Sequence, residues 1–249
     1  REIKRMKFSV SRDALIKPLN LVAGVVERRQ TLPILSNVLM NLEGNRLSLT
    51  GTDLEVELVG RIDVQSEGAD GDITVPARKL VDICKSLPDG VDISFSVEDG
   101  KVTVRAGRSR FTLSTLPAAE FPTVEAGDGE IDLDLAQPLV RQMIDRTGFA
   151  MAQQDVRYYL NGMYLEIKEG RLRFVATDGH RLALCTAPGQ VAADDKSVIV
   201  PRKGILELSR LLDGDGSVTL SVGSNHIRAA TDQFTFTSKL VDGKFPEYE

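Results

Sequence analysis

The sequence predicts an α+β fold made of two tandem copies of one unit, with helices packed on one face of antiparallel sheets. Short segments of alternating apolar and polar residues recur along the chain and are separated by Gly-containing turns, which is typical of antiparallel strands. A 42% hydrophobic and 27% charged composition is that of an ordinary folded protein. No apolar run approaches the roughly 18 residues that a membrane-spanning helix needs.

An internal repeat organises the chain. Three pairs of segments match at a spacing of 125 residues, and a fourth pair at 124: 8–10 with 133–135, 47–53 with 172–178, 75–80 with 200–205, and 121–122 with 245–246. Such self-similarity indicates duplicated structural units. We therefore expect one domain over residues 6–125 and a second over 130–249, joined by the polar, Gly-rich linker 124–130.

Each unit repeats again at half scale as a strand, a helix and several further strands. The first unit should contain, in order, strand 8–10, helix 12–26, strand 73–75, helix 77–87 and strands 91–97, 101–105 and 111–113. In helix 77–87 the apolar residues recur at the spacing of one helical face. Pro18 should kink or weaken the first helix. The second unit should place helices near 136–151 and 202–213.

The two ends carry their own expectations. Met6 begins a segment that reads as a natural start, so residues 1–5 are expected to be the remnant of an expression tag. The chain stops after Glu249 with neither a capped helix nor a polar tail, which favours a shortened chain.

The charge is segregated along the chain. The net charge of −5 argues against a simple basic nucleic-acid binder, yet the four segments that contain the predicted helices, 11–29, 77–88, 136–154 and 201–213, hold 12 basic and only 6 acidic residues. If these helices line one surface, that surface is positive and suits sequence-independent contact with a polyanion backbone. The alternative is a set of ordinary solvated helix faces.

Motifs for catalysis or metal binding are weak. Asp178 and His180 could belong to a catalytic triad, but Asp178 corresponds to Asp53, which no histidine follows. Both aspartates are therefore expected to be structural turn residues, and a hydrolase that uses His180 is the lesser alternative. The segment 213–224 lacks the Gly and Glu of a calcium loop, so we expect no metal and no cofactor.

The two cysteines, Cys84 and Cys185, are expected to be buried small apolar residues. They can form neither a disulfide framework nor a zinc site by themselves, which favours a reduced, cytoplasmic protein.

Longer motifs closely resemble the bacterial DNA polymerase III β subunit family, the replicative sliding clamps. They are TLPILSN (31–37), LTGTDLEVE (49–57), RSRFTLSTLPAAEFP (108–122), QDVRYYLNGM (154–163), ATDGHRLA (176–183), VIVPRKG (198–204) and FTSKLVDGKFPEY (236–248). The resemblance implies three clamp domains per chain, of which the third is absent here, and a ring of two chains joined head to tail. It also implies a processivity factor without catalysis, which encircles duplex DNA inside the cytoplasm at the nucleoid.

The resemblance implies two sets of binding residues. Those matching the family's DNA contacts are Arg29, Arg78, Gln154, Tyr158, Tyr159, Arg202 and Lys203. Those matching the cleft that takes Leu- and Phe-containing peptides of the polymerase and the clamp loader are Arg157, Leu160, Thr177, Gly179, His180, Arg181, Leu182 and Pro246. Packing in a core or interface is the alternative for the two tyrosines, and an ordinary surface position is the alternative for His180.

Two further expectations follow from the resemblance. The strand with Phe111 and Leu113 would contact the other subunit of the ring and, without it, would be an exposed sheet edge. The segment 179–182 (GHRL) differs from its counterpart 54–57 (LEVE), as expected if only the second copy holds the peptide. The alternative function is a monomeric module that grips the DNA backbone directly.

Overall fold

The computed structural model describes residues 5–28, 31–124 and 131–249. The predicted linker therefore lies, apart from Val124, outside the described residues. The chain separates into two compact units, one of residues 1–123 with 232–234 and one of residues 124–231 with 235–249.

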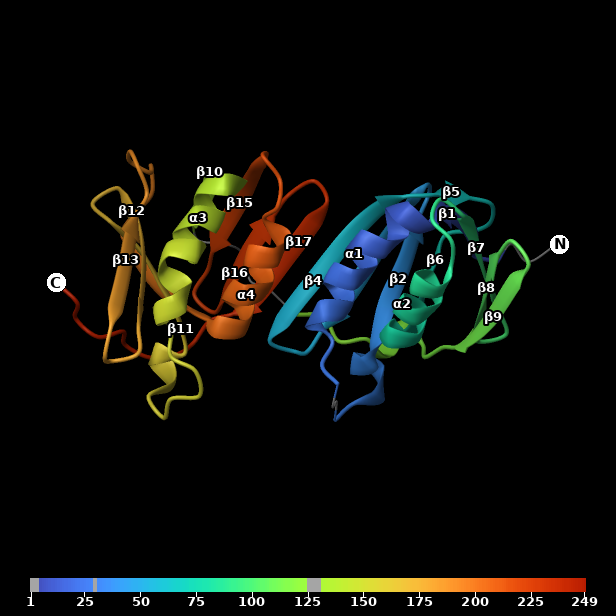
Figure 1. Cartoon of the computed structure of the whole chain (residues 1–249), viewed down its shortest axis with the longest axis horizontal. Coiled ribbons are helices and arrows are strands. Elements are labelled where there is room, and N and C mark those ends of the chain that lie inside the picture. Colours follow the sequence, from blue (N-terminus) through green and yellow to red (C-terminus); the bar gives the residue numbers. More distant parts are fainter. Residues whose placement is uncertain (1–4, 29–30, 125–130) are drawn as a thin grey trace. The chain divides into compact units, whose positions relative to one another are not determined.

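The first unit repeats the order strand, helix, three strands, as Figure 1 shows in blue to green. Its elements are β1 (Lys7–Ser11), α1 (Arg12–Val25), β2 (Asn37–Glu43), β3 (Arg46–Thr52), β4 (Val56–Asp63), β5 (Gln65–Ser66), β6 (Gly71–Pro76), α2 (Ala77–Ser86), β7 (Asp92–Glu98), β8 (Lys101–Ala106) and β9 (Ser109–Ser114). Antiparallel pairing gives the strand orders β5-β1-β7-β8-β9 and β4-β3-β2-β6. The two helices pack side by side, so the α+β prediction is confirmed.

Alternating burial explains the strands of this unit. In β8, Val102 and Val104 are buried whereas Lys101 and Arg105 are exposed, as expected when one face of a strand covers the core. Cross-strand partners also stack: the rings of Phe8 in β1 and Phe95 in β7 lie 4.8 Å apart at an interplanar angle of 11°.

Helix α1 continues without interruption past Pro18. It begins with a cap in which the Ser11 hydroxyl accepts the amide of Ala14 at 3.2 Å. The expected weakening at Pro18 is offset because the stripe that includes Leu15 and Leu19 is fully buried, and burial of an amphipathic face stabilises a helix more than propensity does.

The second unit has the same order of elements, except that its described residues contain no counterpart of the two-residue strand β5, and this order confirms the internal repeat. They are β10 (Ile131–Ala136), α3 (Gln137–Thr147), β11 (Gly162–Lys168), β12 (Arg171–Thr177), β13 (Leu182–Thr186), β14 (Lys196–Pro201), α4 (Arg202–Leu211), β15 (Ser217–Val222), β16 (His226–Ala230) and β17 (Phe234–Lys239). The strand orders are β10-β15-β16-β17 and β13-β12-β11-β14.

Two details differ from the sequence predictions. The α-helix α3 ends at Thr147, earlier than predicted, and residues Gly148–Ala150 form a 3-10 turn, because Gly148 follows at the helix end and glycine disfavours continuation of a helix. Cys84 is buried as predicted, but the prediction for Cys185 is wrong. Cys185 lies on the outer strand β13, so it is only partly buried.

Candidate partner-binding cleft and nucleic-acid interface

A tight turn connects β12 and β13. The Asp178 carboxylate accepts the amides of His180 at 2.9 Å and Arg181 at 3.1 Å, and these bonds lower the pKa of Asp178. The Thr177 hydroxyl donates to the carbonyl of Arg181 at 2.7 Å and accepts the amide of Gly179 at 3.1 Å. The side chains of Thr177 and Asp178 thereby close the turn from both sides.

The first unit contains the same turn. Asp53 accepts the amides of Glu55 and Val56 at 2.9 and 2.8 Å, and Thr52 donates to the carbonyl of Val56 at 2.9 Å. Leu54 holds the left-handed φ of 78° where Gly179 has 87°. The prediction that Asp53 and Asp178 are structural turn residues is confirmed.

Arg157 lies directly over the turn of the second unit. Its guanidinium donates to Asp155 at 3.0 and 2.8 Å and to the carbonyl of Asp178 at 3.2 Å. A Cβ atom at position 179 would come within 2.8 Å of Arg157 Nη1, so glycine allows this close approach. Hydrogen bonds from Arg157 lower the pKa of Asp155 to about 2.

Arg181 marks the other side of the turn. Its Nε donates to Asp178 at 3.1 Å, its Nη2 donates to the carbonyl of Phe149 at 2.8 Å, and its guanidinium lies 5.4 Å from the centroid of the Phe149 ring. The turn is thus flanked by two arginines whose positions are fixed by hydrogen bonds.

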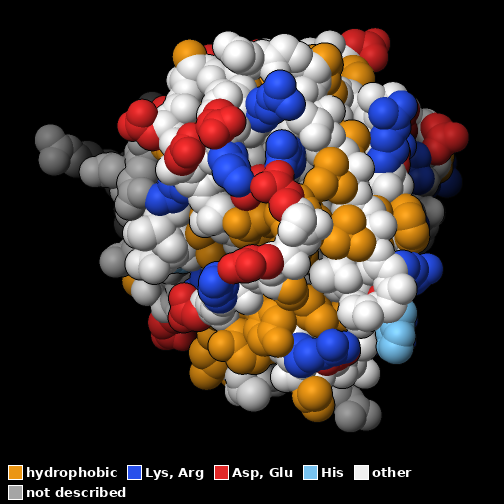
Figure 2. Space-filling view, turned by 90° about the vertical axis from the view of Figure 1, so that its left-hand side faces the viewer, with side chains coloured by type: hydrophobic (Ala, Val, Ile, Leu, Met, Phe, Trp, Pro, Cys, Tyr) orange, Lys and Arg blue, Asp and Glu red, His pale blue; other side chains and the backbone are white. Residues whose placement is uncertain are grey.

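Apolar side chains surround this turn. Leu182 is 47% exposed, and Phe149 and Tyr158 are more than half exposed. Figure 2 looks onto the unit from the side on which Figure 1 draws β12 and β13, and hydrophobic side chains gather there between charged ones. Such a combination of apolar surface and a few oriented polar groups is typical of a binding site.

The predicted cleft residues do not all contribute surface. Leu160 is only 2% exposed and packs in a core cluster with Phe245, so it supports the cleft from behind more than it forms a wall. Thr177 is also buried and acts through the turn, whereas His180 and Pro246 are exposed. Arg157 thus lies at the turn, and Leu160 shares its core cluster with Phe245, the residue before Pro246. Pro246 itself lines a pocket with β11 and β14.

Sequence reasoning missed Asp155 and Phe149. Asp155 accepts both the main-chain and the side-chain donors of Arg157, a pattern that an aspartate two residues before an arginine in a loop could have indicated. Phe149 lies within the helix predicted over 136–151, where an apolar residue is expected to face the core. No signal in the sequence therefore indicated that its side chain is exposed.

The predicted DNA contacts occupy comparable places in the two units. Arg78 and Lys203 are the second residues of α2 and α4, Arg202 is the first residue of α4, and Arg78 is exposed. Gln154 is exposed with a φ of 56°. Arg29 lies outside the described residues.

The two predicted tyrosines differ in burial. Tyr158 is exposed, whereas Tyr159 packs against the core cluster, and their rings meet edge to face at 5.7 Å. Tyr159 thus has the packing role that was the alternative to DNA contact, although part of it remains at the surface.

Not every basic helix residue is free to meet a polyanion. Arg12 donates to Asp89 at 2.7 Å, to Asp13 at 3.3 Å and to the carbonyl of Cys84 at 3.0 Å. The charge of Arg12 is therefore neutralised within the unit, where it ties the start of α1 to the end of α2.

The predicted subunit contact lies on β9. This strand is the outer strand of its sheet in the described part of the chain, as expected, and Phe111 is partly exposed. Leu113 is only 5% exposed because it points toward the core. Phe111 and the free strand edge, more than Leu113, are available for contact.

Across the described ranges, no three His, Cys, Asp or Glu side chains are grouped so that they could hold a metal ion. None of the helices that the structure describes is both long and apolar enough to cross a membrane.

Comparison with known proteins identifies the family. The sequence matches the DNA polymerase III beta subunit, N-terminal domain, over residues 6–125 and the central domain of the same subunit over residues 134–247. The beta sliding clamp of Pseudomonas aeruginosa is 66% identical over 246 residues, which cover 98% of this chain and 67% of that protein. The beta sliding clamp of Escherichia coli K12 is 52% identical over 244 residues, with the same coverage.

Solved structures of sliding clamps support the same family. A Pseudomonas aeruginosa sliding clamp bound to griselimycin has a TM-score of 0.95 and 65% identity, with 98% of this chain and 67% of that chain covered. The chain thus belongs to the DNA polymerase III beta subunit family, the beta sliding clamps, which act as processivity factors in DNA replication.

Proposed function

We propose that this chain supplies the first two domains, residues 6–125 and 130–249, of a clamp that encircles duplex DNA as a ring of two chains. In this proposal a third domain of the same kind completes each chain, and the strand edge of β9 contacts the neighbouring subunit. The clamp makes and breaks no bond. It works in the cytoplasm at the nucleoid and keeps the replicative polymerase close to the primer end, which raises the effective concentration of the polymerase there.

The proposed DNA contacts are electrostatic and independent of sequence. The exposed side chain of Arg78 at the start of α2 supports them, because helix starts and arginines both favour phosphate oxygens. Replacing Arg78 by alanine should weaken binding to any duplex equally. It should also reduce the slope of log affinity against log salt concentration by about one, the value for one phosphate contact.

A plasmid experiment tests encirclement. The chain extended by its third domain is loaded by its clamp loader onto a nicked circular plasmid, which is then linearised. Release on linearisation supports a topological link. Retention on linear DNA contradicts it and favours the module that grips the DNA backbone directly.

The observation that carries the partner proposal is the hydrogen-bonded turn that fixes Arg157 and Arg181 and is followed directly by the exposed Leu182. We infer that an apolar anchor of a polymerase or clamp-loader peptide packs on Leu182, with His180, Gly179 and Pro246 around it.

Fluorescence anisotropy with a labelled peptide that carries Leu and Phe anchors tests this inference. Leu182→Ala should weaken binding about fivefold, because apolar contact area is lost. Leu206→Ala is the matched control, since Leu206 is equally exposed at 47% on α4. Equal affinities of the two variants would contradict the assignment.

A further inference from the structure

The segment 241–249, which we name the strap, forms neither helix nor strand. The amide of Val241 donates to the carbonyl of Ile199 at 2.9 Å. Beyond Val241, the strap makes no main-chain to main-chain hydrogen bond with any described residue. The position of Pro246 must therefore be set by side chains on either side of it.

An aromatic anchor precedes Pro246. The Phe245 side chain is buried, and its ring stacks on Tyr164 of β11 with centroids 4.6 Å apart and an interplanar angle of 6°. Phe245 shares its core cluster with Leu160, the residue that supports the candidate cleft from behind. The first anchor of the strap is thus part of the cleft's own core.

A polar anchor follows Pro246. The Tyr248 hydroxyl donates to Glu166 of β11 at 2.5 Å and accepts from Arg173 of β12 at 3.3 Å. Arg173 also pairs with Glu249. Burial, together with the bond to Glu166, raises the pKa of Tyr248.

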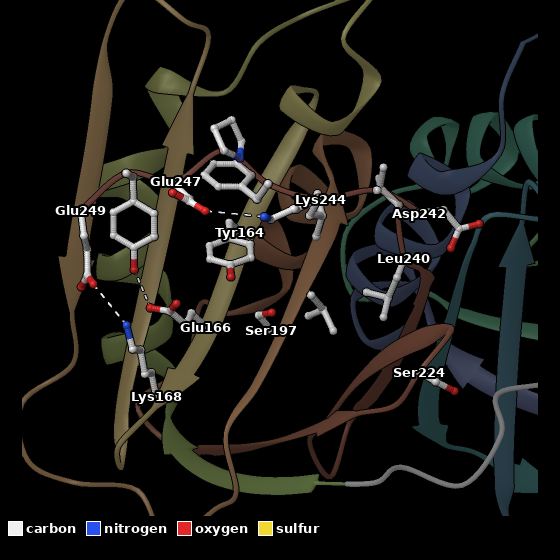
Figure 3. A pocket seen from close by; sticks show the side chains of 17 residues that line it. Tyr164, Glu166, Lys168, Ser197, Ser224, Leu240, Asp242, Lys244, Glu247 and Glu249 are labelled. Carbon is white, nitrogen blue, oxygen red and sulfur yellow. Dashed lines mark hydrogen bonds and ion pairs between the residues drawn. The ribbon is translucent and has the colours of Figure 1, made fainter.

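The ends of this anchor can be followed in the close-up. Figure 3 shows Glu166, Lys168 and Glu249 together at one end of a pocket of about 640 Å³ that the strap helps to line, with Lys168 paired to Glu249 at 3.2 Å. The pocket walls come from the strap and from the outward-facing residues of β11 and β14, including Tyr164 and Ser197.

The strap also passes close to the two tyrosines of the proposed DNA contact. A Cβ atom at Gly243 would lie 3.3 Å from Tyr159 Cβ and 3.4 Å from Tyr158 Cε2, and its φ of 143° favours glycine. The strap is thus fixed at Gly243, at Phe245 and at Tyr248, and Pro246 lies between the last two.

We propose that Tyr164, Arg173 and Tyr248 are positioning residues of the partner cleft, which hold Pro246 where an incoming peptide meets it without touching the peptide themselves. This inference rests on the proposed function of the cleft. A strap released from either anchor would present Pro246 correctly for only part of the time, and the apparent affinity falls by that fraction.

The test uses Tyr248→Phe, which keeps the ring and removes only the hydroxyl. We expect the affinity for the peptide with Leu and Phe anchors to fall about three- to tenfold, the range for net loss of an ordinary hydrogen bond. Ser221→Ala is the matched control, because it removes another hydroxyl-to-carboxylate bond of 2.5 Å, to Asp132 on the other sheet of the unit. It should leave peptide affinity unchanged.

A double-mutant cycle separates positioning from general destabilisation. If Tyr248 acts through Pro246, Tyr248→Phe should weaken binding no further in a chain that already carries Pro246→Ala. Additive losses, or an unchanged peptide affinity in Tyr248→Phe, would overturn the inference while leaving the cleft assignment intact. Failure of the unaltered chain to bind the peptide, or an unchanged affinity after Pro246→Ala, would overturn both.

Discussion

Replacing Gly179 by alanine tests how tightly the turn and Arg157 are matched. The backbone at Gly179 has a φ of 87°, and a Cβ there would come within 2.8 Å of Arg157 Nη1. Gly189 is the matched control in the same unit, because its φ is 79° and a Cβ there would have no neighbour within 4 Å. Both substitutions impose the same backbone strain, and only the first displaces a side chain.

The expected magnitudes follow from these two facts. A left-handed conformation costs a residue with a Cβ about 1–2 kcal/mol, and the stiffer unfolded chain returns roughly half of that. Gly189→Ala should therefore lower the free energy of unfolding by about 0.5–1 kcal/mol. Gly179→Ala should lower it by about 1–2 kcal/mol, because the hydrogen bond from Arg157 to the carbonyl of Asp178 is also lost from a partly exposed side chain.

Urea unfolding followed by circular dichroism measures both values, and peptide anisotropy gives the functional consequence. We expect only Gly179→Ala to weaken peptide binding, because only this substitution displaces the guanidinium of Arg157 from its place over the turn. Equal stability and equal peptide affinity of the two variants would refute the argument that glycine is needed at position 179 for the approach of Arg157.

Three further outcomes can be checked on the same chain. The pKa of Asp155 lies near 2, below its ordinary 3.8, so the stability from its ionised form is complete above about pH 4 and is lost as the pH falls toward 2. In thermal scans, the melting temperature of Asp155→Asn should depend less on pH between about pH 2 and pH 4 than that of the unaltered chain. Burial raises the pKa of the Cys84 thiol to about 11, so iodoacetamide at pH 8 should alkylate Cys185 first, as mass spectrometry of peptides would show. Arg12→Ala should lower the free energy of unfolding by about 1–2 kcal/mol in urea titrations without changing duplex affinity, because its guanidinium is already paired with carboxylates inside the unit.

The repeat made much of the fold predictable. The spacing of 125 residues and the alternation of apolar residues indicated the order of helices and strands in both units, and the paired Asp53 and Asp178 identified the two turns. These features depend on local backbone chemistry, which neighbouring residues in the sequence reveal.

What the sequence did not reveal depends on contacts between distant residues. The pairing of Arg12 with Asp89 joins residues 77 positions apart. Arg12 was expected to be a charge on a helix surface, but its side chain connects the start of α1 to the end of α2. Leu160 was expected to form a wall of the cleft, but it is buried in a cluster with Phe245. This contact joins residues far apart in the sequence, so local patterns did not reveal it. The partial exposure of Cys185 follows from the place of β13 at the outside of its sheet, which strand order alone determines.

The shared turn of the two units has a consequence for how this protein can diverge. The threonine and aspartate that close the turn use the same hydrogen bonds in both copies, although Leu54 occupies the left-handed position in one and Gly179 in the other. The backbone shape is therefore independent of the three or four side chains that it displays. In each copy, the side chains on the turn can therefore change without a change of its backbone. One copy of the duplicated unit can acquire a new binding specificity at this turn while the other copy keeps the same fold.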